Sequence, residues 1–230
     1  MNRSKHLYKI SVFALLLLSL SLLSCSGPLK QSSISAHELY KTSDVIEFNN
    51  NSIGFFTTSV PRSNGFSEYK TAVSDIIESV FRVERADLSV IQSRDIINRI
   101  NSSELTHEYA DMLQGYELTG ILDKKVLKKI GDILGVRYIA RPKLTTYVER
   151  TSTRLSAFGL ALISTRETSV NISLELWDVE TGNIVWEASG QATIAVEAMR
   201  VKPVSFQDVA EHASRSLVKK FPAPAVIVSP

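Results

Sequence analysis

The clearest alternation of apolar and polar positions lies in the last third of the chain, in VNISLELWDVETGNIVWEASGQ (Val170–Gln191). Apolar residues occupy every second position from Val170 to Leu176, which is typical of a strand with one buried face. They return at every second position from Ile184, and the DVETGN between the two runs holds turn residues, including Gly182. The segment therefore predicts a β-hairpin.

Three other segments repeat apolar residues at helical spacing. The first is predicted to begin at Ser67 and has an apolar stripe over Val73–Phe81. The second begins at Asp123, a favoured N-cap residue, and ends at Gly135, which can take the left-handed conformation that closes helices. The third begins at Ser205 and resembles a capping box.

Shorter runs complete the predicted order β-α-β-α-α-α-β-β-β-α. This order predicts an α/β (α+β) fold in which one mixed sheet has helices packed against it, in a single domain over residues 50–222. The remaining strands are predicted at Ile53–Val60, Leu88–Ile91 and Val136–Val148, where Pro142 implies an edge position or a bulge. The remaining helices are predicted at Glu104–Tyr116 and after Ser93, whose hydroxyl is expected to be the N-cap.

The first 24 residues have the composition of a secretory signal peptide. Basic residues precede an apolar run, Val12–Leu23, and Ser24 is a small residue at its end. The run is shorter than the ~20 residues that a membrane-spanning helix needs. We expect residues 1–24 to be a cleaved leader, with an uncleaved anchor as the alternative.

The cleavage region Leu22-Leu23-Ser24-Cys25 resembles the lipobox of bacterial lipoproteins, in which the cysteine is acylated and becomes the first mature residue. Cys25 is the only cysteine, so no intrachain disulfide is possible, and lipidation explains its position. Several acyl chains hold a protein firmly to a membrane. Ser26 follows, not the Asp that often retains lipoproteins in the inner membrane, so the resemblance implies the periplasmic face of the outer membrane.

Residues 25–49 are predicted to be the lipidated cysteine and a tether. Ser26–Ser35 is polar, Ala36–Lys41 predicts a helical turn, and Val45–Phe48 predicts an extra edge strand. A flexible tether of this length reaches about 30 Å, which keeps the domain near its membrane. The apolar tail 223–230 is expected to be loose or to add to a sheet edge.

The sequence lacks the motifs of several enzyme and binding classes. His37-Glu38 and His107-Glu108 lack the second histidine of H-E-x-x-H zinc proteases. The nucleophile-elbow, phosphate-loop and dinucleotide-binding motifs are absent as well. Three of the 26 basic residues lie in the leader, which leaves 23 against 24 acids and no nucleic-acid footprint. We expect no catalytic residues, cofactor, metal, nucleic acid or small-molecule substrate.

Two features of the hairpin are candidate sites. Asp178 and Glu180 flank the turn, and paired carboxylates can do acid–base chemistry. Alternatively, Asp178 caps the turn through its backbone and Glu180 is solvated. The cross-strand residues Trp177 and Trp186 form either a ligand platform or a packing surface for a helix. The structural role is the expected one in both cases.

The apolar nonamer LSAFGLALI (Leu155–Ile163) lies between two predicted strands, bracketed by Arg154 and Arg166. A loop is normally polar, so this one is expected to have a partner. It is either a lid over the core or a contact for another protein, for another copy of the chain or for the bilayer interface. The candidate contact residues are Leu155, Phe158, Leu160, Leu162 and Ile163.

Three segments resemble a known superfamily. Ile130–Ala140 is similar to the helix-into-strand segment of the curli-secretion lipoprotein family (CsgG), and similar segments occur in LpoB and the TolB N-terminal domain. Val170–Trp186, with its D-V-E-T-G turn, resembles their next hairpin, and Ser89–Asn101 resembles their second strand and following helix.

The resemblance covers most of residues 50–220. It implies a non-enzymatic, periplasm-facing α/β domain used for assembly. The first hypothesis is therefore a lipid-anchored periplasmic adaptor that binds another envelope protein or forms a homo-oligomer. The alternatives are a subunit of a curli-type outer-membrane secretion channel and an envelope hydrolase whose site the sequence does not reveal.

Overall fold

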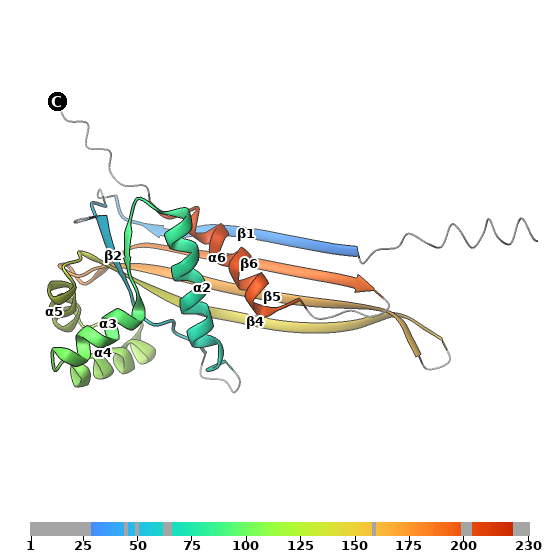
Figure 1. The fold of residues 1–230 in the computed structure, drawn as a ribbon, viewed down its shortest axis with the longest axis horizontal. Helices are drawn as coiled ribbons and strands as arrows, with labels where there is room; N and C mark the ends of the chain where they lie inside the picture. Colours follow the sequence, from blue (N-terminus) through green and yellow to red (C-terminus); the bar gives the residue numbers. More distant parts are fainter. Residues whose placement is uncertain are drawn as a thin grey trace, which may run out of the picture.

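One six-stranded mixed sheet with helices on both faces forms the fold, as predicted (Figure 1). The computed structural model describes residues 29–43, 46–48, 51–61, 66–157, 160–198 and 204–222. The strands are β1 (Leu29–Lys41), β2 (Ser52–Phe55), β3 (Ser89–Ile91), β4 (Tyr138–Ala157), β5 (Leu160–Asp178) and β6 (Asn183–Ala198). The helices are α2 (Tyr69–Glu84), α3 (Ser93–Ser102), α4 (Thr106–Thr119), α5 (Lys124–Leu134) and α6 (Phe206–Val218).

The strand order is β1-β6-β5-β4-β2-β3. β2 pairs in parallel with β3 and β4, whereas β4, β5, β6 and β1 are antiparallel neighbours. The edge position or bulge expected at Pro142 is wrong, because β4 lies inside the sheet between β5 and β2 and its register shift comes later, between Leu144 and Thr146. β2 ends at Phe55, before Pro142, and the Pro142 carbonyl accepts a hydrogen bond from the Ser59 N–H at 2.9 Å. The long antiparallel strands make up most of the sheet.

The main core lies between one face of the sheet and helices α2 and α6 (Figure 1). The apolar positions of β5 from Val170 to Leu176 are completely buried there. Gly190 of β6 allows α6 to approach closely, because an added Cβ would lie 2.3 Å from the Ala213 carbonyl oxygen. The N-cap prediction for α6 is confirmed, since the Ser205 hydroxyl accepts a hydrogen bond from the Asp208 N–H at 3.2 Å.

A second core lies on the opposite face, under α3, α4 and α5, near the end of the sheet where β2 and β3 lie. The Asp123 N-cap is confirmed, and Gly135 closes α5 with φ 69°. Ser93 is not the N-cap of α3: its N–H donates to Glu78 of α2 at 3.1 Å. A buried carboxylate thus replaces the expected hydroxyl cap and joins the two helices.

The antiparallel strands continue well past the helices and form a projecting end (Figure 1). This projecting end comprises residues 29–31 of β1, 150–157 of β4, 160–167 of β5 and 195–198 of β6, which the strand register brings side by side. The predicted loop Leu155–Ile163 is therefore wrong for the described residues. β4 and β5 remain paired up to Ala157 and Leu160.

The prediction for the N-terminal segment is also wrong in its described part. Residues 29–41, expected to be tether and helical turn, form the 13-residue strand β1, paired with β6 along its whole length. Of the expected edge strand Val45–Phe48, the described residues 46–48 are not in a strand, although Ile46 and Phe48 are buried in the main core. The tail 223–230 lies outside the described residues.

Candidate functional site

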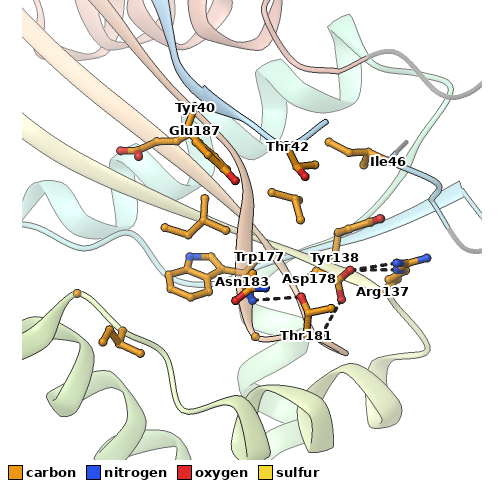
Figure 2. A pocket seen from close by; sticks show the side chains of 15 residues that line it. Tyr40, Thr42, Ile46, Arg137, Tyr138, Trp177, Asp178, Thr181, Asn183 and Glu187 are labelled. Carbon is orange, nitrogen blue, oxygen red and sulfur yellow. Dashed lines mark hydrogen bonds and ion pairs between the residues drawn. The ribbon is translucent and has the colours of Figure 1, made fainter. Parts of the chain in front are cut away.

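A groove of about 730 Å³ opens beside the β5–β6 turn (Figure 2). One wall is the end of β1 and the segment after it, with Tyr40, Thr42 and Ile46. Another wall is the turn itself, and the connection between α4 and α5 closes a third side through Gly120 and Ile121. The groove is therefore formed where the end of β1, the α4–α5 connection and the hairpin turn meet.

Asp178, the most catalytic-looking acid of the sequence, has a structural role in this wall. One carboxylate oxygen accepts hydrogen bonds from the N–H groups of Glu180 and Thr181 at 2.8 and 3.2 Å, which caps the turn. The other accepts two from the Arg137 guanidinium, at 3.1 and 3.2 Å (Figure 2). Glu180 is exposed and pairs with Lys128 at 2.7 Å. The two acids are therefore not a catalytic pair.

A buried polar network lies on the face of the sheet that carries the second core, between β4, β5 and α4. The Glu175 carboxylate accepts hydrogen bonds from Lys143 at 2.7 Å, from the Tyr116 hydroxyl at 2.8 Å and from the Trp177 indole at 3.0 Å. Arg141 stacks on the Tyr116 ring, with 3.9 Å between the guanidinium carbon and the ring centroid. These bonds satisfy a carboxylate that is almost fully buried, and they fasten α4 to the sheet.

Glu187 is the second acid of the groove, and it belongs neither to the Glu175 network nor to the contacts of Asp178. It lies directly opposite Glu175 in the register of β5 and β6, and it points into the groove region near Tyr40 (Figure 2). Burial raises the pKa of the Glu187 carboxyl, and the negative charge of Glu175 adds to the rise while Lys143 opposes it. Like charges directly opposite on a sheet are destabilising, so Glu187 takes up protons more readily than an exposed glutamate.

The two tryptophans do not form a platform. Trp177 belongs to the second core, whereas Trp186 is buried in the main core on the other face. Leu176 pairs with Trp186 and Trp177 pairs with Ile184, so Val185 is the extra residue of a β-bulge. This one-residue shift places Trp186 on the opposite face from Trp177. The Trp177 ring contacts Tyr116 of α4, as expected of helix packing, whereas the Trp186 ring contacts Phe221, which follows α6.

Strand β1 carries exposed apolar side chains, on both faces of the sheet, that the sequence pattern does not reveal. Its side chains Leu29, Ile34, Leu39 and Tyr40 are 67%, 47%, 58% and 48% exposed, and they are four of the nine large exposed apolar residues in the described part of the chain. β1 is also the edge strand of the sheet. The signal was present in the sequence as isolated apolar residues, but they follow neither a two-residue nor a helical period.

Of the predicted functional residues, Cys25 and Phe158 lie outside the described residues. The other candidate contact residues lie among the last paired residues of β4 and β5: Leu155, Leu160, Leu162 and Ile163. In the strand register Leu155 is opposite Ile163, and Ala157 is opposite Leu160. The structure thus gathers them at the tip of the projecting end. We define Leu155–Ala157 and Leu160–Ile163 as the hairpin tip.

Within the described residues, no group of three or more His, Cys, Asp or Glu side chains is placed to hold a metal ion. None of the helices in the described part of the chain is long and apolar enough to cross a membrane.

No family model and no curated protein sequence matches this chain. In structure it is similar to the PelC dodecamer from Paraburkholderia phytofirmans, with a TM-score of 0.44 and 11% identity, over 82% of this chain and 96% of that chain. It is also similar to lipoprotein GNA1162 from Neisseria meningitidis, with a TM-score of 0.33 and 16% identity, over 61% of this chain and 80% of that chain. The similarity to the LpoB C-terminal domain from Escherichia coli has a TM-score of 0.36 and 10% identity, over 65% of this chain and 86% of that chain.

Proposed function

We propose that this protein is a lipid-anchored adaptor of the bacterial envelope, which binds another envelope protein through the edge of strand β1 and catalyses no reaction. The observation that carries the proposal is the long edge of β1 with its exposed apolar side chains. The lipobox at Cys25 supplies the expected anchor, on the periplasmic face of the outer membrane.

An open edge strand is a template for pairing with another chain, because its outer N–H and C=O groups have no strand beside them. Proteins usually protect long edges with charges or keep them short. The opposite edge, β3, has only three residues, whereas β1 has 13 and exposes Leu29, Ile34, Leu39 and Tyr40. Strand addition by a partner would cover these apolar side chains and complete the backbone pairing.

The position of β1 relative to the anchor fits an adaptor. Only four residue steps separate Cys25 from Leu29. Fully extended, these steps span about 14 Å, roughly half the reach expected for a longer tether. A partner bound along β1 would therefore be held close to the membrane surface.

The groove beside the turn favours binding over hydrolysis. Its described lining includes no serine, cysteine, histidine or lysine, the residue types that most often serve as nucleophile and base. Of its two acids, Asp178 is occupied by Arg137 and by the turn.

A subunit of a curli-type secretion channel remains the second candidate, because the β4–β5 hairpin projects past the helices (Figure 1). Closed rings of the purified lipoprotein in detergent would favour this alternative. Particles with one copy of the chain bound to a different protein would favour the adaptor.

The anchor is tested by Cys25→Ala. We expect the variant to leave the washed membrane fraction and to collect in a soluble or unprocessed pool, because acylation is its main attachment. A variant that still pellets completely with outer membranes would show that a different anchor holds the protein.

The binding surface is tested by placing a photo-crosslinking residue at Leu39 or, as a matched control, at Leu118. Both leucines are exposed, at 58% and 71%, but Leu118 lies on α4. We expect a crosslink of defined mass to another envelope protein from position 39 and none from position 118. Crosslinks from 39 only to a second copy would replace the adaptor by a homo-oligomer, and equal crosslinking from both positions would refute the edge site.

A further inference from the structure

Three parts of the molecule meet at the same end of the sheet. β1 is antiparallel to β6, and Leu29 lies opposite Glu197, so the chain arrives from Cys25 at the projecting end. β6 reaches this end at Ala198, opposite Ser164. The hairpin tip lies beyond both, at the far end of β4 and β5 (Figure 1). Leu29, four residues after the expected lipid anchor, and the apolar tip therefore lie at the same end of the sheet, although about 130 residues separate Cys25 from the tip in the sequence.

The residue types change along the projecting hairpin. Its stem, Arg150–Arg154 on β4 and Ser164–Glu167 on β5, consists of Ser, Thr and three Arg with one acid, Glu167, opposite Arg150. The tip contains four leucines and isoleucines with small residues between them and no charge. Arg166 and Lys30 lie in the same row of the sheet, both opposite Val196. An apolar end followed by basic residues is the composition of segments that lie in an anionic lipid interface.

Length separates a surface contact from a spanning one. Each arm of the tip has three or four residues, about 10 Å at 3.3 Å per residue. A membrane-spanning strand needs about 9–11 residues, whereas interfacial segments bury their apolar side about 5–10 Å deep. The tip fits the boundary between head groups and acyl chains, and it is too short to cross a bilayer.

The reach of the anchor fits the same depth. Leu29 shares a row with Glu197, Thr165 and Ser152, and Ala157 lies five residues farther along β4. Five residues extend about 17 Å, close to the ~14 Å that the four steps from Leu29 to Cys25 can span. The acyl chains and the tip can therefore enter one leaflet together, with the strands directed away from the membrane.

We propose that the hairpin tip, Leu155–Ala157 and Leu160–Ile163, is a second membrane contact that inserts into the lipid interface beside the acylated Cys25. Of the roles expected for this segment, a lid over the core does not agree with a hairpin that runs past the helices. Membrane insertion accounts for both its composition and its place next to the anchor. This inference rests on the proposed lipid anchor for the position of the membrane, whereas the insertion of the tip into lipid depends only on the residues of the tip.

The experiment places a fluorescent probe at the tip. The mature chain with Cys25→Ala has no thiol, so Leu162→Cys provides a single site for an environment-sensitive nitrobenzoxadiazole label. A hexahistidine tag at the N-terminus attaches the protein to phosphatidylethanolamine–phosphatidylglycerol vesicles that contain nickel-chelating lipid. The matched control is Glu180→Cys, an exposed position in the turn at the other end of the sheet.

We expect the label at position 162 to brighten several-fold and shift to the blue on vesicle attachment, and to be quenched by spin-labelled lipids. The label at position 180 should not change. Adding Leu160→Glu should reverse most of the change at 162. Without the tag, Leu160→Glu should lower vesicle partitioning about tenfold, because an inserted leucine gains ~0.8 kcal/mol per buried CH₂ and a tenfold change needs only 1.4 kcal/mol.

Three results would overturn the proposal. A label at position 162 that keeps its aqueous spectrum on vesicles would show that the tip does not reach lipid. A label that is already shielded in dilute, lipid-free protein would make the tip part of the core. Shielding that depends on protein concentration and not on lipid would make it a contact between copies. Because the tag replaces the acyl chains, none of these results depends on whether Cys25 is lipidated.

Discussion

Strands β4 and β5 pass through two different environments along their length. In the body of the sheet, where helices cover them, the positions of β5 from Val170 to Leu176 that face α2 and α6 are completely buried. At the projecting end the same strands continue past the helices (Figure 1), and in its stem Ser, Thr and Arg replace most of the apolar residues before the apolar hairpin tip. Backbone pairing is continuous across both parts.

The difference separates two uses of apolar residues. In the body they fill a close-packed core, so their number and volume determine the stability of the fold. At the hairpin tip they lie beyond the helices and follow a polar stem. Their removal is expected to change what the protein binds, with little effect on folding.

The largest loss of stability is expected from Trp186→Ala, in the body of the sheet. Trp186 is 0% exposed, and its indole donates to Glu38 of β1 at 3.0 Å. We expect unfolding by urea to show a loss of about 3–5 kcal/mol, the usual cost of removing a large core aromatic. Ile34→Ala on the exposed β1 edge is the control, and a comparable loss there would mean that the edge is already covered in the monomer.

The next effect concerns the polar network that fastens α4 to the sheet. Lys143→Met leaves the buried Glu175 carboxylate without its cation, and we expect a loss of about 2 kcal/mol, within the range for hydrogen bonds to charged groups. Adding Glu175→Leu should restore part of this loss, because it removes the unpaired charge. Additive losses in the double variant would show that the two residues are not coupled.

A smaller and pH-dependent effect is expected at Glu187. Its pKa is raised in the folded protein, so it stabilises the fold when protonated, and this contribution is lost as the pH rises through the folded pKa. Glu187→Gln should therefore raise the melting temperature at pH 7 and give little gain below about pH 4. Solvent screening limits the gain to less than about 1 kcal/mol. An equal gain at both pH values would assign the effect to packing and not to charge.

The smallest effect on stability is expected at the tip. Leu160→Glu should change the free energy of unfolding by less than about 0.5 kcal/mol, as for other substitutions away from a core. The same variant should lose its membrane contact, so vesicle binding should fall while the melting curve stays nearly unchanged. A fall in stability comparable to that of Trp186→Ala would remove the distinction between body and tip.

The body of the fold was largely predictable because burial leaves a periodic pattern in the sequence. The hairpin at Val170–Gln191 alternates because one of its faces lies on the main core. Helix α5 shows both of its ends, since Asp123 and Gly135 carry out the capping chemistry that their residue types favour. The turn role of Asp178 followed from the same local chemistry.

The parts that the sequence did not predict lack such a pattern. β1 is exposed over nearly its whole length, so nothing constrains its residues to alternate, and its Ser, Ala and His residues read as a tether. The stem of the projecting hairpin is missed for the same reason. Trp177 and Trp186 were misplaced relative to each other because a β-bulge shifts the register by one residue, and no residue near Val185 signals it.

The direction of β1 has a mechanical consequence. Its first residue lies at the projecting end of the sheet, which is the membrane end in the proposal above, and its 13 residues run back along β6 toward the body. If a partner pulls the body away from the membrane, the anchor draws on β1 along its own axis. The hydrogen bonds to β6 are perpendicular to that force and share it along the whole strand, so they resist together and cannot open one after another. The protein would thus withstand tension between the membrane and a bound partner.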